Sequence, residues 1–570
     1  MKQTKLTGYP SIDKPWLKYY SKEAINAPLP ECTIYEYLWE NNKLHLDDIA
    51  IIYYEKKITY WELFKKIDRV AAAFAYIGVK KGDVVTMLVL NQPETVYCLY
   101  ALNKIGAIPT VINVLSSPKE IVHYMEECDS RYLVVLDALF EKAYSAFRLY
   151  PMQKMVYLSL FQSRGVVSRT AYRMKVKQPK AGEKEIISWP DFLHGTNAEV
   201  PAVRKDPKTC AIIGHTGGTT GTPKGVLLSD NAFNSIPAQY NMIVPHHRQE
   251  SFLNLIVPHA TYGVIANIHL PLSLGMKVIL IPKVDPVMVD KTFIEYKPNY
   301  VPSIPLYWNA VIDSKIITDL SFLKWASSGG SGLSQERIEK FNLLAEKCHS
   351  KAKMLIGYGM TEVCSLACTQ MNWNAVAGSV GFPLPHNIIS AFDPESMEEK
   401  TYNQVGEICM RGPSVMLGYI GNEEETKKMI RMHSDGQVWI HSGDLGYVDE
   451  NGNVFIQGRI KRIYLTMMSG LHSKIFPDRI EQTLSKHPDI RECGVVCIAT
   501  EKNVYTPFAF CSLKNEKSEE ELTKELVSLA KDDLPEYDLP VKYIFVQTLP
   551  RTSQGKIDYR ALEERAAKEA

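Results

Sequence analysis

The sequence lacks three features that would assign a protein to a special class at once: a net charge, a cysteine framework and a long apolar run. Its 65 lysines and arginines balance 64 aspartates and glutamates, so the formal net charge is +1. This balance gives no reason to expect nucleic acid or an anionic membrane surface as a partner. The eleven cysteines are scattered through 570 residues, which favours reduced thiols in a cytoplasmic protein.

Metal-site and membrane patterns are missing as well. Cys364 and Cys368 lie four positions apart, but no second pair accompanies them as a zinc site would require. The segment from Met1 to Asp13 has no apolar core of the kind found in signal peptides. No apolar run reaches the ~18–20 residues that span a bilayer. We therefore expect a cytoplasmic protein without an integral membrane segment.

What the first half of the chain does contain is an alternation of helical and strand patterns. Thr59 and Glu62 form a capping box, apolar residues then recur at helical spacing, and Gly78 marks the end of that helix. A buried strand is expected over 84–90 and a helix over 94–105. Further strands are expected over 132–136 and 277–281, and Ser334 should cap a helix that begins at Gln335. This alternation predicts an α/β fold, a large body of layered sheets and helices.

The pattern changes near residue 460. Residues 446–458 are typical of a hairpin with Asn451-Gly452 at its turn. A compact α+β pattern follows, with a helix over 478–486, strands over 491–499, 505–513 and 542–547, and a helix capped by a Ser518/Glu521 box. We predict an N-terminal body over 1–458, a hinge over 459–461 and a small α+β C-terminal lid domain over 462–570.

The most informative segment is the loop over 215–225, which lies between two apolar strand-like runs. It contains four glycines, four threonines and Lys224. Glycines let backbone N–H groups turn toward an anion, and the hydroxyls and the lysine add donors and charge. The loop is not a Walker loop, because proline precedes its lysine and a strand follows it. The composition fits a polyphosphate; the alternative is an exposed, flexible loop.

Four shorter motifs follow, each with a plain alternative. Residues 327–333 contain three glycines that would permit flat contact with a planar ring, or would only form a tight turn. The stretch 358–362 combines an aromatic ring, a hydroxyl and a carboxylate, which suit a base, a phosphate and Mg²⁺, or a polar helix start. Asp444 after Gly443 can accept ribose hydroxyls, although such turns are often only turns. Lys556, near the C-terminus, would by itself be a solvated lysine.

Taken together and in this order, the motifs resemble the adenylate-forming superfamily, which includes acyl- and aryl-CoA synthetases, adenylation domains of peptide synthetases and luciferases. The resemblance runs from about Thr33 to Leu562. The chain looks most like a standalone acyl- or aryl-CoA synthetase.

The resemblance implies a nucleotide site. A mobile loop would hold the β- and γ-phosphates of ATP through Thr216, Gly217, Gly218, Thr219, Thr220, Gly221 and Lys224. Gly330, Ser331 and Gly332 would line one face of adenine, and Tyr358 would lie on the other. Thr361 would contact the α-phosphate, Glu362 the Mg²⁺, Asp444 the ribose and Arg459 the nucleotide.

It also implies moving parts and an acyl pocket. Lys461 would be the hinge, and Lys556 would neutralise charge during adenylation. The segment after the hinge is longer than the family's usual pattern, and Gly470 in it would approach the thiol tunnel. Either His259 or Tyr262 could be the aromatic residue that gates the acyl site, although His259 could equally be packed in a turn. Gly357 would form the pocket wall and leave room there, which disfavours acetate.

The expected function is ATP-dependent activation of a carboxylic acid to acyl-AMP with release of pyrophosphate, followed by thioester formation with coenzyme A. ATP, Mg²⁺ and coenzyme A are the expected cofactors. One alternative is that the acyl group passes to a separate carrier protein; a luciferase-like oxygenase is conceivable. Another is a non-catalytic nucleotide-binding relative, which the presence of Lys556, Glu362 and Asp444 disfavours.

Overall fold

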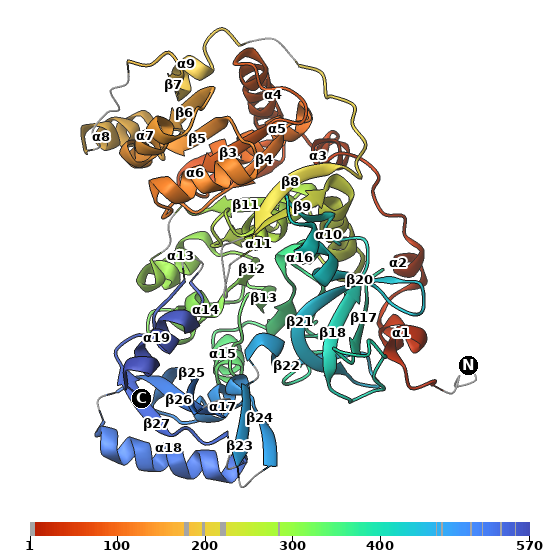
Figure 1. The fold of residues 1–570 in the computed structure, drawn as a ribbon. Coiled ribbons are helices and arrows are strands. Elements are labelled where there is room, and N and C mark those ends of the chain that lie inside the picture. The colour runs from red at the N-terminus through yellow and green to blue at the C-terminus, as the bar shows by residue number, and fades with distance from the viewer. Residues whose placement is uncertain are drawn as a thin grey trace.

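The fold of the chain is described from a computed structural model, which Figure 1 shows as a ribbon. It describes residues 6–175, 182–196, 200–216, 224–282, 285–462, 464–468, 471–501, 504–515, 517–535, 538–552 and 555–569. None of the helices within these ranges combines the length and the apolar character needed to cross a lipid bilayer.

Two large sheets form the body. The first has the strand order β19-β9-β8-β4-β3-β5-β6-β7, with parallel pairing from β8 through β7 and an antiparallel hairpin of β8 and β9. Its strands are β3 (Val84–Leu88), β4 (Ile108–Val111), β5 (Tyr132–Leu136), β6 (Lys154–Leu158), β7 (Ile186–Ser188), β8 (Cys210–His215), β9 (Gly225–Ser229) and β19 (Gly418–Tyr419). The expected strand over 132–136 is confirmed, and the one expected over 84–90 ends at Leu88.

The second sheet has the order β16-β15-β14-β13-β12-β10-β11-β1-β2, and β1 and β10 to β14 run parallel. Its strands are β1 (Ile49–Tyr53), β2 (Lys56–Thr59), β10 (Ser251–Asn254), β11 (Lys277–Leu280), β12 (Tyr300–Ser303), β13 (Trp325–Ser328), β14 (Met354–Tyr358), β15 (Cys368–Thr369) and β16 (Phe382–Pro383). Tyr358 therefore belongs to a strand rather than to the loop after it.

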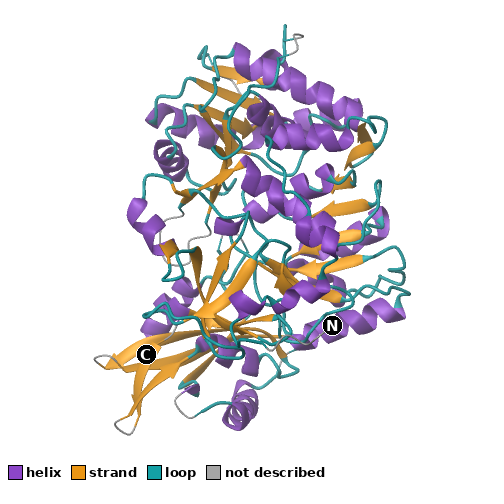
Figure 2. Cartoon of the chain, turned by 90° about the vertical axis from the view of Figure 1, so that its right-hand side faces the viewer, coloured by secondary structure: helices purple, strands orange, loops and turns teal. Residues whose placement is uncertain are grey.

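Helices separate and cover the sheets, as Figure 2 shows. The helices that share one apolar core with the facing sides of both sheets include α3 (Ile34–Asn42), α4 (Tyr60–Tyr76), α5 (Pro93–Lys104), α10 (Asp230–Ile243) and α12 (Leu270–Ser273). The outer face of the first sheet is covered by α6 (Pro118–Glu127) and α7 (Phe140–Leu149). The outer face of the second is covered by α13 (Val289–Tyr296), α14 (Pro305–Ile312) and α15 (Gln335–Lys347). The predicted layered α/β body is confirmed.

Local capping signals work as expected at two helices. The Thr59 hydroxyl accepts a hydrogen bond from the Glu62 amide, the Glu62 carboxylate accepts one from the Thr59 amide, and α4 (Tyr60–Tyr76) begins there. Gly78 follows it with φ +98°, a conformation that costs glycine little. Ser334 caps α15 through the Arg337 amide.

A smaller sheet adjoins the body and contains β17 (Ile388–Phe392), β18 (Gly406–Arg411), β20 (Ile430–Met432), β21 (Val438–Val448) and β22 (Val454–Arg459). The expected hairpin exists as β21 and β22, but its connection runs over 449–453, because Val448 is paired with Val454. Of the expected Asn451-Gly452 turn, Gly452 adopts the left-handed conformation, with φ +88°.

The C-terminal part begins with η6 (Ile460–Arg462), which contains the predicted hinge residue Lys461. Beyond it lie β23 (Tyr464–Met468), β24 (Leu471–Ile475), α17 (Pro477–Leu484), β25 (Ile490–Glu501), β26 (Val504–Leu513), α18 (Glu519–Asp533), β27 (Lys542–Val546) and α19 (Tyr559–Glu569). Helices α17 and α18 share one apolar core with β25 and β26, and α19 shares another. The Ser518/Glu521 capping box was a wrong expectation: Ser518 stands at the N-cap of α18 without a side-chain capping hydrogen bond.

Candidate active site

The site begins at one edge of the second sheet. Because β12, β13 and β14 are parallel neighbours, the segments that follow their carboxyl ends lie side by side. Gly329 to Gly332 follow β13, and η5 (Thr361–Val363) follows β14. Gly330 has φ +79°, and a Cβ built there would lie 3.5 Å from Ile304, just after β12. The predicted adenine strip is therefore an exposed, side-chain-poor surface beside Ile304.

Tyr358, Asp444 and Arg459 form one hydrogen-bonded group. The Tyr358 hydroxyl donates to Asp444 Oδ2 at 2.5 Å, and Arg459 Nε lies 2.9 Å from Oδ1. The Asp444 carboxyl is only 3% exposed. Burial raises its pKa, whereas the positive charge of Arg459 and the Tyr358 hydrogen bond act in the opposite direction. The arrangement fixes the Asp444 carboxyl group at the hydroxyl end of the Tyr358 ring.

The hairpin was expected over 446–458, but its first strand already begins at Val438 and contains Ser442, Gly443 and Asp444. These residues lie within β21, as a bulge between the pairs Cys409–His441 and Glu407–Leu445. Gly443 has φ +71° and donates its amide to Glu407 Oε1 at 2.9 Å. The bulge turns the chain so that Asp444 faces Tyr358.

Lys556 reaches this group from the C-terminal part of the chain. Burial and the charge of Arg459 lower its pKa, while Asp444 and Glu362 favour its charged form. Four charged residues therefore surround the same space. One further contact joins the C-terminal part to the body: Lys514 Nζ lies 3.5 Å from Glu336 of α15. Gly555 also lies near Ile304, since a Cβ built on Gly555 would be 4.0 Å from Ile304 Cδ1.

Tyr419 links Glu362 to Lys224, at the end of the predicted phosphate loop, and nothing in the sequence pattern pointed to it. Its hydroxyl donates to Glu362 Oε1 at 2.7 Å, and Lys224 Nζ lies 4.9 Å from the centre of its ring. Lys224 also pairs with Glu425 of α16 (Glu423–Met429). That contact, together with Lys428, lowers the pKa of Glu425 to about 2.

Hydrogen bonds join the two ends of the predicted phosphate loop. The Thr216 amide donates to the Lys224 carbonyl at 3.1 Å, and the Lys224 amide donates to the Thr216 hydroxyl at 3.1 Å. Gly217, Gly218, Thr219, Thr220 and Gly221 lie outside the described residues, as does Gly470. The backbone of Lys461 is described, but its side chain is not.

The surroundings of Glu362 fit a magnesium ion. Its carboxylate is 5% exposed, and the hydrogen bond to Oε1 fixes its orientation. Within the described part of the chain, Oε2 accepts no hydrogen bond, so a hard oxygen is free for the hard cation that accompanies a polyphosphate.

The two candidates for the acyl gate lie in different surroundings. A Cβ on Gly329 would lie 3.4 Å from the Gly357 carbonyl and 3.8 Å from the Tyr262 hydroxyl, so Tyr262 of α11 (Thr261–Val264) adjoins the predicted pocket wall. The neighbouring Thr261 hydroxyl lies 3.4 Å from that of Thr361. His259 instead interacts electrostatically with His215, and burial lowers its pKa to about 4.

Comparison with known proteins assigns the chain to a family. The family model for the AMP-binding enzymes matches residues 38–420, and that for the AMP-binding enzyme C-terminal domain matches residues 479–556. The chain belongs to the AMP-binding enzyme family. This member is 29% identical to a long-chain-fatty-acid–CoA ligase of Bacillus subtilis, over 97% of the chain and 98% of the relative. It is 27% identical to a probable 4-coumarate–CoA ligase of Dictyostelium discoideum, over 96% of the chain and 97% of the relative.

The fold of this AMP-binding enzyme also occurs in solved structures. The crystal structure of an anthranilate CoA ligase in complex with anthranoyl-AMP superposes with a TM-score of 0.82 at 22% identity, covering 96% of this chain and 99% of that chain. A benzoate CoA ligase from Burkholderia xenovorans superposes with a TM-score of 0.79 at 21% identity, covering 93% of this chain and 100% of that one. These likenesses establish the two-part fold.

Proposed function

We propose that this AMP-binding enzyme joins a carboxylic acid to coenzyme A through an acyl-adenylate. The observation that carries the proposal is the convergence of Lys556, Arg459, Asp444 and Glu362 beside Tyr358. The relatives named as CoA ligases, which match the chain over nearly its whole length, support coenzyme A as the acceptor.

In the first step, a carboxylate oxygen of the acid attacks the α-phosphorus of ATP. The new bond is between that oxygen and phosphorus, the α–β phosphoanhydride bond breaks, and pyrophosphate leaves. Negative charge redistributes over phosphate oxygens, so fixed cations and donors lower the barrier. Lys556 and Arg459 supply the charge, Thr361 a hydroxyl, and Lys224 exchanges Glu425 for a phosphate.

The nucleotide is oriented by the remaining groups. Adenine lies between Tyr358 and the strip from Gly330 to Gly332, and Asp444 accepts the ribose hydroxyls. Mg²⁺ at Glu362 would shield the charge of the phosphate oxygens. Tyr262 and Gly357 border the acid, because both adjoin Gly329.

In the second step, the thiol sulfur of coenzyme A attacks the acyl carbon, the bond from that carbon to the AMP oxygen breaks, and the thiol proton passes to solvent. In the described arrangement Lys556 lies beside Arg459, Asp444 and Glu362, the residues that we assign to the nucleotide. We infer that the lid rotates about Lys461 to withdraw Lys556 and admit the thiol, with the segment around Gly470 nearby.

The proposal is tested by pyrophosphate release from ATP and Mg²⁺ with aryl, short-, medium- and long-chain acids, each with and without coenzyme A. We expect release that requires one class of acid and turns over repeatedly only with coenzyme A, accompanied by one AMP per thioester. Release that requires an acid but ignores coenzyme A would point to a carrier protein. Absence of release with every acid, although ATP binds, would contradict the catalytic assignment.

A further inference from the structure

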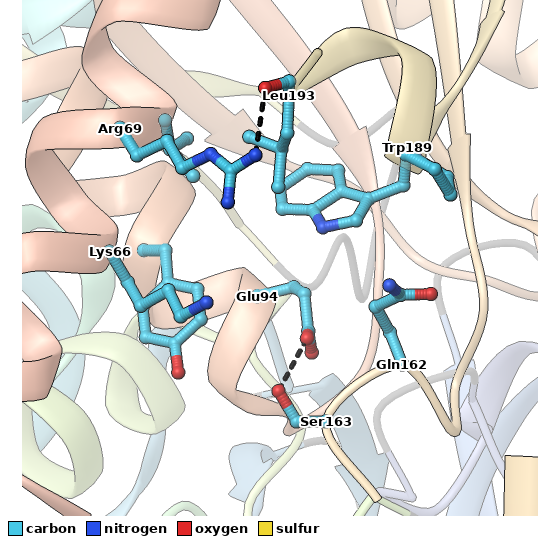
Figure 3. Close-up of a pocket in the computed structure, with 10 residues that line it drawn as sticks. Lys66, Arg69, Glu94, Gln162, Ser163, Trp189 and Leu193 are labelled. Atoms are coloured by element: carbon cyan, nitrogen blue, oxygen red, sulfur yellow. Dashed lines mark hydrogen bonds between the residues drawn. The ribbon is translucent and has the colours of Figure 1, made fainter. Parts of the chain in front are cut away.

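A second polar pocket lies in the N-terminal part of the body, lined by residues that have no place in the candidate active site. It has a volume of about 300 Å³ and lies between α4, α5, the segment after β6 and α9 (Trp189–Phe192). Figure 3 shows Lys66, Arg69 and Glu94 extending into it, with Trp189 and Gln162 on the other side.

Glu94 is a buried carboxyl group that is only partly satisfied. Its side chain is 2% exposed, and Oε1 accepts a hydrogen bond from the Ser163 hydroxyl at 2.5 Å. Its Oε2 is buried and has no hydrogen-bond partner among the described residues. Burial raises the pKa of Glu94 to about 7, although Ser163 and the charge of Lys66 oppose that shift. An acceptor of this kind is costly unless a donor meets it.

The two cationic side chains of the pocket, Lys66 and Arg69, form no ion pair with Glu94 within the described part of the chain, and Arg69 has an unpaired nitrogen. Arg69 Nη2 donates to the Leu193 carbonyl at 3.0 Å, but its Nε is buried without a hydrogen-bond partner among the described residues. Lys66 stands three residues earlier on the same helix, so both side chains leave the same face of α4. No ion pair joins either of them to Glu94 within the described part of the chain, and the cavity lies between the charges.

We propose that this pocket binds a small aromatic anion that carries a hydrogen-bond donor on its ring. The anionic group would lie between Arg69 and Lys66, because these two cationic side chains line the cavity and a guanidinium binds oxyanions well. The ring would pack against Trp189, which is buried and lines the cavity. The donor would reach Glu94 Oε2, the carboxyl oxygen of this pocket that has no hydrogen-bond partner among the described residues.

The probe is 4-aminobenzenesulfonate, compared with benzenesulfonate, and binding is measured by isothermal titration calorimetry on the full-length protein. A sulfonate carries the anion without the carboxyl carbon that thioester formation requires, so binding is measured without turnover. We expect one site per chain for 4-aminobenzenesulfonate. We expect about tenfold weaker binding of benzenesulfonate, since it leaves Glu94 Oε2 unpaired.

Variants localise the binding. Arg69→Gln should weaken both probes by about tenfold or more, because it removes a charge-assisted contact. Glu94→Gln should weaken only the amino probe and so reduce the difference between the two sulfonates. Lys119→Gln, which removes an exposed lysine from α6, is the matched control and should change neither affinity. Thermal unfolding of each variant shows whether it is folded.

Three results would overturn the proposal. One is the absence of binding to the wild-type protein at millimolar probe. Another is binding that Arg69→Gln and Glu94→Gln leave unchanged. The last is binding abolished by Asp444→Asn, which would place the probe in the nucleotide site. None of these results depends on whether the chain makes a thioester, so this inference and the proposed function can fail separately.

Discussion

At the scale of single residues, Lys556 lies where its positive charge could stabilise the transition state of acyl-AMP formation. It lies beside Arg459, where burial and the Arg459 charge lower its pKa, and beside Asp444 and Glu362, whose charges favour its protonated form, so the side chain is positioned before ATP arrives. A preorganised cation of this kind acts on charge that develops in the transition state. We expect Lys556→Ala to slow acyl-AMP formation by about 10²–10³-fold, measured as acid-dependent exchange of pyrophosphate into ATP.

The same variant should still bind ATP and still convert supplied acyl-AMP and coenzyme A to a thioester, because the lysine is withdrawn for that step. Lys524→Ala, which removes an exposed lysine from α18, is the matched control. Equal loss of both half-reactions in Lys556→Ala would show that the lysine stabilises the fold instead of the transition state.

Glu94 gives a second prediction at this scale. Its pKa is about 7 in the folded chain and 4.5 in its ordinary state. As the pH rises from 4.5 to 7, the unfolded chain releases this proton first, so the wild-type protein loses stability over that window. Glu94→Gln has no such proton. We expect its stability relative to the wild type to increase by about 3 kcal/mol between pH 4.5 and pH 7.5, measured by urea unfolding. A difference that does not change with pH would contradict the assignment.

At the scale of elements, the bulge in β21 sets the position of Asp444, the residue proposed to bind the ribose. Gly443 has φ +71° and nothing within 4 Å of a built Cβ, so a side chain there would be strained without any clash. Gly443→Ala should destabilise the protein by about 1 kcal/mol. It should also raise the KM for ATP several-fold, because the bulge aims Asp444.

Gly436 is a close control, since it also has φ +71° with nothing within 4 Å but lies in the turn between β20 and β21. Gly436→Ala should cost similar stability, measured by thermal unfolding, and leave the KM for ATP unchanged. Equal effects of both variants on the KM would mean that the bulge does not position Asp444.

The helix ends that could be predicted from the sequence were those marked by capping residues nearby in the chain. Thr59 and Glu62 gave the start of α4, and Gly78 its end, because a capping box acts within a few residues. Ser518 carries the same signal, yet α18 begins there without it, since the signal permits the hydrogen bond but does not require it. The bulge at Gly443 depends on pairing with β18, more than thirty residues earlier, which no local pattern records.

At the scale of the whole molecule, the motifs predicted which residues gather but not what holds them. Tyr358, Asp444, Arg459 and Lys556 were each proposed from the sequence, and the fold brings them together. Tyr419 and Glu425 were missed, because an ordinary tyrosine and a glutamate in an acidic helix carry no signal of their own. Their contacts with Glu362 and Lys224 arise only when β19 pairs with β9.

Whether the lid must move between the two steps is also a question about the whole molecule. Lys556 and Lys514 of the C-terminal part interact with residues of the body, and η6 is the segment that connects the two parts. Proline at Lys461 fixes φ near −65° and restricts the residue before it, so the hinge can no longer change conformation freely. We expect Lys461→Pro to keep acid-dependent pyrophosphate exchange within a few-fold of the wild type and to lose thioester formation from acyl-AMP by about 10²-fold or more.

Lys461→Ala is the matched control, because it removes the same side chain and leaves the backbone free. It should retain both half-reactions within a few-fold. If Lys461→Pro loses acyl-AMP formation and thioester formation to the same extent, the substitution does not act by blocking rotation of the lid between the two steps. If it retains both, the thiol reaches the acyl-adenylate while Lys556 still occupies the nucleotide site, and the lid does not alternate about this residue.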